Sequence, residues 1–215
     1  MENIIAMIDV FHKGGVVMYL LLFMSVFIVA LAVNRFLFFK NNDSGRSFTH
    51  EFYALMEQGD YAEAAALAKE TKGATADIIN RALMNGHIGH SSNLTVFLNI
   101  QSGIALAKFR EYLYFLNVIV TAAPLLGLLG TILGMIGAFS ILDSASGAIG
   151  ITNGVGEALI ATASGIFVAL VALSVHSYFK QRLEGIITDM EQVFSELEAK
   201  RTAILKSGGA NHEIA

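Results

Sequence analysis

The sequence predicts an all-α integral membrane protein. Of its 215 residues, 54% are hydrophobic and only 15% are charged, whereas a soluble domain carries about 25% charged residues. The chain therefore lacks the polar side chains that would cover its surface in water. One proline and the absence of cysteine argue against a turn-rich β protein and exclude disulfides, thiolate metal sites and cysteine nucleophiles.

Three long apolar runs predict three transmembrane helices. Residues 14–34, 112–142 and 158–179 contain no Asp, Glu, Lys or Arg. A helix rises about 1.5 Å per residue, so each run is long enough to cross a hydrocarbon core about 30 Å thick. The runs lack the alternation of barrel strands. We assign the transmembrane helices to residues 14–39, 113–140 and 157–179.

The distribution of Lys and Arg predicts the orientation. Residues 40–112 contain seven and residues 180–215 contain five, whereas residues 1–13 contain one and residues 141–156 none. Cytoplasmic loops carry the excess of basic residues. We therefore expect residues 40–112 and 180–215 to form cytoplasmic helical extensions, with residues 1–13 and 141–156 outside. Arg35, near the inner end of the first span, is expected to reach the lipid headgroups.

Two alternative interpretations are a cleaved signal peptide at residues 1–32 and a nucleic-acid-binding protein. Residues 1–32 also have features of a signal peptide, with Lys13, a short apolar core and a small-residue pair at Ala30 and Ala32. The apolar run continues to Phe39, and cleavage would leave the basic segment 40–112 outside, so we expect the first helix to be retained. The net charge of −4 without a basic block gives no support to nucleic-acid binding.

The first cytoplasmic segment is predicted to contain a helical hairpin. Apolar residues recur at helical spacing in 48–58 and 61–70, separated by Gly59 and Asp60, and Asp60 is placed to cap the second helix. The hairpin has features of a tetratricopeptide repeat, but only one copy is present and solenoids need several.

The extensions also contain a histidine pair and helices that continue from the second and third spans. His87 and His90 form an H-x-x-H pair without a third ligand, so we expect a solvated loop and no metal or cofactor. From about Leu94 the helical pattern runs without a breaker into the second span. The third span continues to about Lys206 with an apolar stripe, which we expect neighbouring copies of the chain to cover.

The second and third spans are rich in small residues, which allow close contact between helix backbones in lipid. Both are therefore expected to pack on helices rather than on lipid. Pro124 removes a helical hydrogen bond and should kink the second span. The residues assigned to packing and to the kink are Pro124, Gly127, Gly130, Gly134 and Gly165.

Two threonines share these small-residue faces. Thr131 lies with Gly127 and Gly134 on one face of the second span, and Thr162 lies with Gly165 on one face of the third. Both fall about 9–12 Å inside the outer ends of their spans. Each hydroxyl could bond to its own helix, but the pairing at one depth favours a shared polar lining.

Glu157 is the only Asp or Glu on the second and third spans, and a carboxylate within a membrane is costly. It either stabilises the amino end of its helix near the headgroups or lies at the outer mouth of a proton route. His176, near the inner end, has a side chain suited to proton relay, although an interfacial histidine is favoured. The spans carry no nucleophile–base pair, metal triad or phosphate loop, so we do not expect an enzyme.

Two motifs resemble a known family. Residues 122–134, AAPLLGLLGTILG, resemble the A-P-x-x-G-L-x-G-T-x-x-G motif of the ExbB/TolQ/MotA proton-channel family. Residues 156–165, GEALIATASG, resemble its E-A-L-x-A-T-x-x-G motif. The three-span layout is similar to that of ExbB, and next to that of TolQ, whereas MotA has four spans.

The resemblance implies a homopentamer in the bacterial inner membrane, so that the outer side is the periplasm. Its pore would hold two single-span partners of the ExbD/TolR type, each with a membrane Asp that takes up and releases protons. Thr131 and Thr162 match the family's pore-lining threonines, and Glu157 matches the glutamate that heads the last helix.

The function implied is that of a motor subunit that uses the proton motive force to energise TonB-dependent transport, through a TonB-like protein. The alternatives are a TolQ-like subunit of the Tol-Pal envelope motor and a non-conducting scaffold. We further expect the smooth Gly/Ala faces to let central partner helices move, so that Gly134→Leu would block coupling and leave assembly intact.

Overall fold

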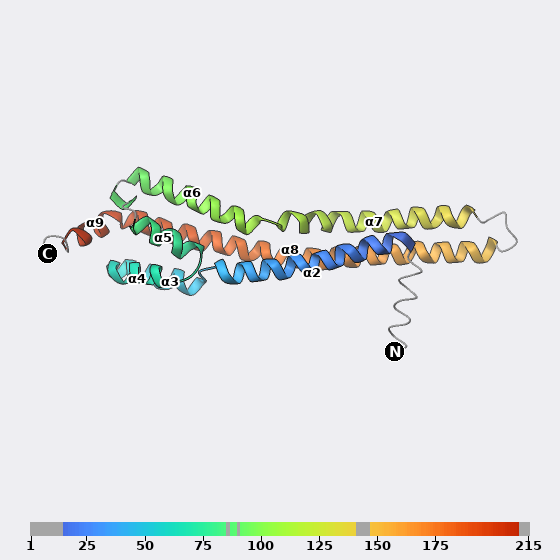
Figure 1. Cartoon of the computed structure of the whole chain (residues 1–215), viewed down its shortest axis with the longest axis horizontal. Helices are drawn as coiled ribbons and strands as arrows, with labels where there is room; N and C mark the ends of the chain where they lie inside the picture. The colour runs from blue at the N-terminus through green and yellow to red at the C-terminus, as the bar shows by residue number, and fades with distance from the viewer. Residues whose placement is uncertain (1–14, 85–86, 90, 141–146, 211–215) are drawn as a thin grey trace, which may run out of the picture. The chain divides into compact units, whose positions relative to one another are not determined.

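The computed structural model describes residues 15–84, 87–89, 91–140 and 147–210 (Figure 1). Every regular element among these residues is a helix, so the predicted all-α class is confirmed. The elements are α2 (Gly15–Asn42), α3 (Arg46–Gln58), α4 (Tyr61–Glu70), α5 (Ala74–Met84), the short 3₁₀ helix η1 (His87–Gly89), α6 (Ser91–Arg110), α7 (Leu113–Ser140), α8 (Gly147–Ala199) and α9 (Arg201–Ala210).

Three helical stretches of the described chain are long and apolar enough to cross a membrane. They are Gly15–Gln58, Asn93–Ser140 and Gly154–Ala199. The prediction of three such helices is therefore confirmed. The chain divides into two compact units, of which the first comprises residues 1–34 and 112–179 and the second residues 35–111 and 180–215.

In the first unit α2, α7 and α8 run alongside one another (Figure 1). The buried residues of α2 follow helical spacing, at Val17, Leu21, Ile28 and Leu31, as on the inner face of an amphipathic helix. Its other large side chains are exposed, including Phe23 at 68%. This is the distribution of a helix that packs on protein along one face and on lipid along the other.

The second unit is a set of short helices around the end of α8. The hairpin expected at 48–58 and 61–70 is present as α3 and α4. Gly59 ends α3 in the left-handed conformation, with φ 85°. Asp60 occupies the N-cap position of α4, but its side chain makes no capping hydrogen bond, so that part of the prediction is wrong.

Tyr53 of α3 is affected by two acidic residues. The Glu57 and Glu196 carboxylates raise the pKa of the Tyr53 phenol, because they disfavour the negative charge of the phenolate.

The continuous helix expected from Leu94 into the second span is interrupted. α6 ends at Arg110, α7 begins at Leu113, and Tyr112 between them has a left-handed φ of 64°. The last turn of α6 accepts a hydrogen bond from a distant side chain, because Arg35 Nη1 donates to the Lys108 carbonyl at 3.0 Å. The carbonyl groups at a helix end need such donors.

Arg35 itself corrects a second expectation. Its side chain is 2% exposed and its guanidinium carbon lies 4.8 Å from the centre of the Phe38 ring. The guanidinium therefore stacks on an aromatic ring and bonds to a helix end within the second unit. The expectation that Arg35 reaches toward lipid headgroups is wrong, because these protein partners replace the solvent around its charge.

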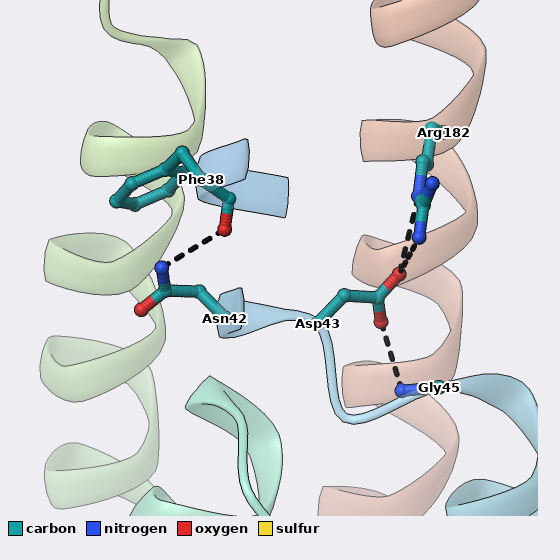
Figure 2. Close-up of polar contacts among 5 residues, drawn as sticks. All are labelled: Phe38, Asn42, Asp43, Gly45 and Arg182. Carbon is teal, nitrogen blue, oxygen red and sulfur yellow. Dashed lines mark hydrogen bonds and ion pairs between the residues drawn. The ribbon is translucent and has the colours of Figure 1, made fainter. Parts of the chain in front are cut away.

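A polar junction joins the end of α2 and the start of α3 to the side of α8 within the second unit (Figure 2). Asp43 Oδ1 accepts a hydrogen bond from the Gly45 amide at 2.9 Å, and Asp43 Oδ2 pairs with Arg182 at 3.2 Å. Asn42 closes the end of α2 by donating to the Phe38 carbonyl at 2.9 Å. We call Asp43, Ser44 and Arg182 the junction, because Ser44 Oγ also accepts from the amide of Ala76 in α5 at 3.2 Å.

The histidine pair expected in a loop falls partly outside the described residues, since His90 is not among them. His87 begins η1, whose Ile88 and Gly89 carbonyls accept hydrogen bonds from Arg201 at 3.2 and 3.3 Å. Within the described ranges, no three His, Asp or Glu side chains gather as metal ligands would.

Candidate functional site

The candidate site lies where α7 and α8 meet in the first unit (Figure 1). Gly127 and Gly165 bring the two backbones together. A Cβ atom on Gly127 would lie 3.1 Å from the Ala161 carbonyl oxygen, and one on Gly165 would lie 2.6 Å from the Ala123 carbonyl oxygen. A Cβ does not fit at Gly165 and would be tightly crowded at Gly127, so the glycines allow the close backbone approach that holds helices together in lipid.

The same contact extends toward the carboxyl end of α7. A Cβ on Gly130 would lie 2.5 Å from the Ala161 methyl group, and one on Gly134 would lie 2.9 Å from the Gly154 carbonyl oxygen. The small-residue face of α7 is therefore buried against α8 of the same chain. The expectation that this face is presented to moving partner helices is wrong, because α8 already occupies the space that the glycines leave.

Thr162 forms a polar link across this contact. Its Oγ1 lies 3.2 Å from the Gly127 carbonyl oxygen of α7 and 3.3 Å from the Ala158 carbonyl oxygen of its own helix. The single hydroxyl hydrogen is shared between these two acceptors. The Thr162 oxygen keeps its lone pairs available as acceptors.

Thr131 lies one helical turn beyond Gly127 and is half-buried. Its Oγ1 donates to the Leu128 carbonyl at 2.6 Å, which is the bond to its own helix that threonines often make. Thr162 thus belongs to the α7–α8 contact, Thr131 lies on α7 one turn beyond the Gly127 carbonyl that Thr162 reaches, and both threonines direct their hydroxyl hydrogens to backbone carbonyls. The arrangement offers two hydroxyl oxygens as hydrogen-bond acceptors.

Glu157 lies away from the threonine pair, at the amino end of α2. Its carboxylate occupies the position that a side chain on Gly15 would take, since a Cβ there would lie 3.0 Å from the Glu157 carboxyl carbon. Gly15 has a left-handed φ of 68°, which favours glycine. Glu157 is half-buried, and its carboxylate lies at the first residue of α2, the end of a helix where the dipole favours negative charge.

Pro124 and His176 are the other predicted residues of these spans. α7 is unbroken through Pro124, which has no N–H to donate to the carbonyl four residues earlier. His176 lies on α8, and its Nδ1 is buried without a hydrogen-bond partner among the described residues. The structure does not bring His176 and the threonines into one polar network within the part of the chain that it describes.

A cavity of about 340 Å³ lies in the second unit, between the ends of α2, α5 and α6. Its walls include the charged residues Asp77, Arg81 and Lys108. Asp77 and Arg81 form an ion pair four residues apart on α5. Because Asp77 and Arg81 neutralise each other, the lining offers no cluster of charged side chains beyond Lys108, and the cavity is a weaker candidate than the α7–α8 contact.

Comparison with known proteins matches residues 63–192 to the MotA/TolQ/ExbB proton channel family. The ExbB-like 1 biopolymer transport protein of Synechocystis sp. is 35% identical over 202 residues, which cover 89% of this chain and 78% of that protein. The chain belongs to the MotA/TolQ/ExbB proton channel family.

Other relatives of the MotA/TolQ/ExbB family match shorter parts of the chain. The biopolymer transport protein ExbB of Xanthomonas campestris is 30% identical, over 64% of this chain and 53% of that protein. The Tol-Pal system protein TolQ of Haemophilus influenzae is 30% identical, over 46% of this chain and 44% of that protein. The family match includes α7 and most of α8, and hence the whole α7–α8 contact, but not α2.

Sequence reasoning placed the threonines and glycines on α7 and α8 but missed two features. It did not find the contact of Glu157 with Gly15 or the junction at Asp43. The pair of Gly14 and Gly15 at the start of an apolar run was the available signal for the first. No local signal marks the second, because Asp43 and Arg182 are 139 residues apart.

Proposed function

We propose that this protein is the proton-channel subunit of a membrane motor. It works with a single-span partner that carries a carboxylic acid within the membrane, and converts downhill proton flow into movement of that partner. Membership of the proton channel family supports the proposal. The observation that carries it is the pair formed by the half-buried Thr131 of α7 and by Thr162 at the α7–α8 contact, with both hydroxyl hydrogens engaged and both oxygens able to accept.

The chemistry is transient binding of a proton by the partner's acid. A protonated carboxylic acid is a donor, and Thr131 or Thr162 would accept its hydrogen bond. After the proton leaves, the carboxylate needs donors, and a threonine hydroxyl can rotate away from its backbone carbonyl to supply one. The net cost of exchanging one such bond is small, about 1 kcal/mol. The threonine pair thus suits both protonation states of the acid.

The acid must come from another chain. Glu157 is the only Asp or Glu on α7 and on residues 147–179 of α8, and its carboxylate lies at the start of α2. Family members work with partner proteins such as ExbD or TolR, and we propose such a partner here, within a pentamer of this chain. Neither a metal nor a cofactor takes part in this scheme.

We propose an ExbB-like role, in which the motor energises TonB-dependent transport across the outer membrane. The relatives named as biopolymer transport proteins support it. The TolQ relative supports the second candidate, a Tol-Pal envelope motor. In both, the protein lies in the bacterial inner membrane, with residues 1–13 and 141–156 periplasmic and residues 40–112 and 180–215 cytoplasmic, as the Lys and Arg distribution favours.

The test replaces each threonine by valine in the complex with its partner. We expect Thr131→Val and Thr162→Val to lower proton flux into proteoliposomes at least tenfold, measured with an enclosed pH-sensitive dye. Thr121→Val is the matched control, because Thr121 also lies on α7 and bonds to its own helix at Val118. Unchanged flux in both variants, at wild-type protein levels, would leave the scaffold as the better description.

A further inference from the structure

We infer that Glu157 is a positioning residue that fastens the amino end of α2 to α8, with Gly15 as its required counterpart. The inference rests on the proposed function only in its flux readout. Three observations carry it: the contact between the two residues, the absence of other acidic side chains among the described residues of the first unit, and the packing of the first turn of α2 against α7.

The contact requires glycine at position 15 for two separate reasons. The backbone there has a φ of 68°, a conformation that L side chains rarely adopt. The Glu157 carboxylate also fills the space that a Cβ would need, and its Cγ lies 3.6 Å from that position. Any side chain at position 15 would therefore displace the carboxylate from the helix end.

Charge explains why a carboxylate occupies this place. The first N–H groups of a helix have no partner within it, and the helix dipole puts about half a positive charge there. α2 has no acidic residue in its own first turn. Glu157 is the only Asp or Glu among the described residues of the first unit. Its carboxylate therefore supplies from α8 the negative charge that α2 lacks.

The fastened end of α2 also touches the candidate site. Val17, two residues after Gly15, lies 3.6 Å from the Cβ position of Gly130 and is 7% exposed. Gly130 in turn packs on the Ala161 methyl group, next to Thr162. Glu157 thus holds α2 where it backs the α7–α8 contact, and its effect on proton flow passes through the placement of Thr162.

This role differs from that of a proton relay in what it requires. A relay needs a group that gains and loses a proton, whatever the residue at position 15. A fastener needs negative charge, the right length and the glycine. Gly15→Ala separates the two roles, because it leaves the Glu157 carboxyl group present and removes only the space beside position 15 that this group occupies.

The experiment uses the full chain in complex with its partner in lipid vesicles. The chain contains no cysteine, so a spin label on Val16→Cys, which is 82% exposed, reports the motion of the amino end of α2 alone. A label on Phe23→Cys, 68% exposed, is the reference within the same helix. Proton flux is measured on the same preparations.

We expect Gly15→Ala and Glu157→Ala to mobilise the Val16 label, to leave the Phe23 label unchanged, and to lower flux at least fivefold. Glu157→Asp in the Gly15→Ala background should restore only part of both readouts, because the shorter side chain leaves room for the methyl group but the strain of an alanine at a φ of 68° remains. Gly59→Ala controls for backbone strain, since Gly59 has a φ of 85° with no atom within 4 Å of its Cβ position.

Opposite results would overturn the inference. A label that stays immobile in Glu157→Ala, or wild-type flux in Gly15→Ala, would show that the carboxylate does not fasten α2. Loss of flux in Glu157→Gln with an immobile label would assign Glu157 to proton relay. The label readout does not depend on flux. A wild-type complex that conducts no protons would therefore contradict the proposed function, and the mobility of the Val16 label would still decide whether Glu157 fastens α2.

Discussion

At the residue scale, the structure gives Arg35 protein contacts in place of the lipid headgroups that the sequence predicts for it. Arg35 is 2% exposed, donates to the Lys108 carbonyl and stacks on Phe38. A guanidinium can satisfy both contacts at once, because it is planar and presents several donors. The residue type is therefore more constrained here than a positive charge near headgroups would be.

Arg35→Lys tests this constraint. We expect it to lower the free energy of unfolding by about 1–3 kcal/mol, the range for a lost hydrogen bond to a charged group, because a lysine cannot both stack and reach the carbonyl. Thermal unfolding in detergent measures the change. Arg110→Lys, at the exposed end of α6, is the control; equal effects of the two substitutions would contradict the assigned role.

At the element scale, the α7–α8 pair was largely predictable. Small residues at helical spacing indicated helix contact, and the structure buries Gly127, Gly130 and Gly134. The sequence could not tell which helix they contact, because the same spacing fits α8 of one chain or a helix of a partner. The geometry decides, and it changes the expected outcome of substitutions in this stripe.

Gly134→Ala is expected to loosen α7 from α8. Its Cβ would lie 2.9 Å from the Gly154 carbonyl oxygen and 3.2 Å from the Ala158 methyl group, and such overpacking costs about 1–3 kcal/mol. Gly134→Leu should therefore lower the amount of assembled complex, rather than block coupling in an intact one. Thermal stability and size-exclusion chromatography measure both effects.

Gly137→Ala is the matched control for that prediction. Gly137 lies three residues further along α7, and no atom lies within 4 Å of its Cβ position. Alanine favours the helix by up to about 1 kcal/mol over glycine, so this variant should be neutral or slightly more stable. Equal losses in the two variants would mean that general helix perturbation, and not the α7–α8 contact, is responsible.

Contacts between elements far apart in sequence were the part that could not be predicted. The break between α6 and α7 has no Gly or Pro, and the donor that satisfies the end of α6 comes from Arg35, 73 residues earlier. Asp43 and Arg182 are likewise distant. Periodicity predicts where helices form and which face is buried, but pairing between elements depends on the folded arrangement.

The junction gives a quantitative test of such a pairing. In a double-mutant cycle of Asp43→Ala and Arg182→Ala, we expect a coupling energy of about 1 kcal/mol, within the range for residues in one network. The Asp43 and Arg182 side chains are 17% and 34% exposed. The control pair is Arg46 with Asp189, 3.8 Å apart with Arg46 72% exposed, where exposed pairs give about 0.2–1 kcal/mol. A larger coupling in the control pair would refute the ranking.

At the scale of the whole molecule, one chain leaves much apolar surface uncovered. Leu125, Ile136 and Phe139 of α7 are each more than 60% exposed, as are Leu159 and Phe167 of α8. Residues near Thr131 belong to this surface, with Ile132 half exposed. Lipid or other chains must cover these side chains in the membrane, which is in keeping with a subunit that completes its site only on assembly.

The protein without its partner should therefore conduct no protons. The only acid among the described residues of the first unit is Glu157, which lies at Gly15, so we expect proteoliposomes that contain only this chain to show background proton flux. Adding a single-span partner with a membrane Asp should raise the flux at least tenfold, and Asp→Asn in that partner should abolish the increase. If this chain alone conducted protons as fast as the complex, a group on α7 or α8 would carry the proton. His176 would then be the first residue to replace, because its Nδ1 is buried and has no hydrogen-bond partner among the described residues.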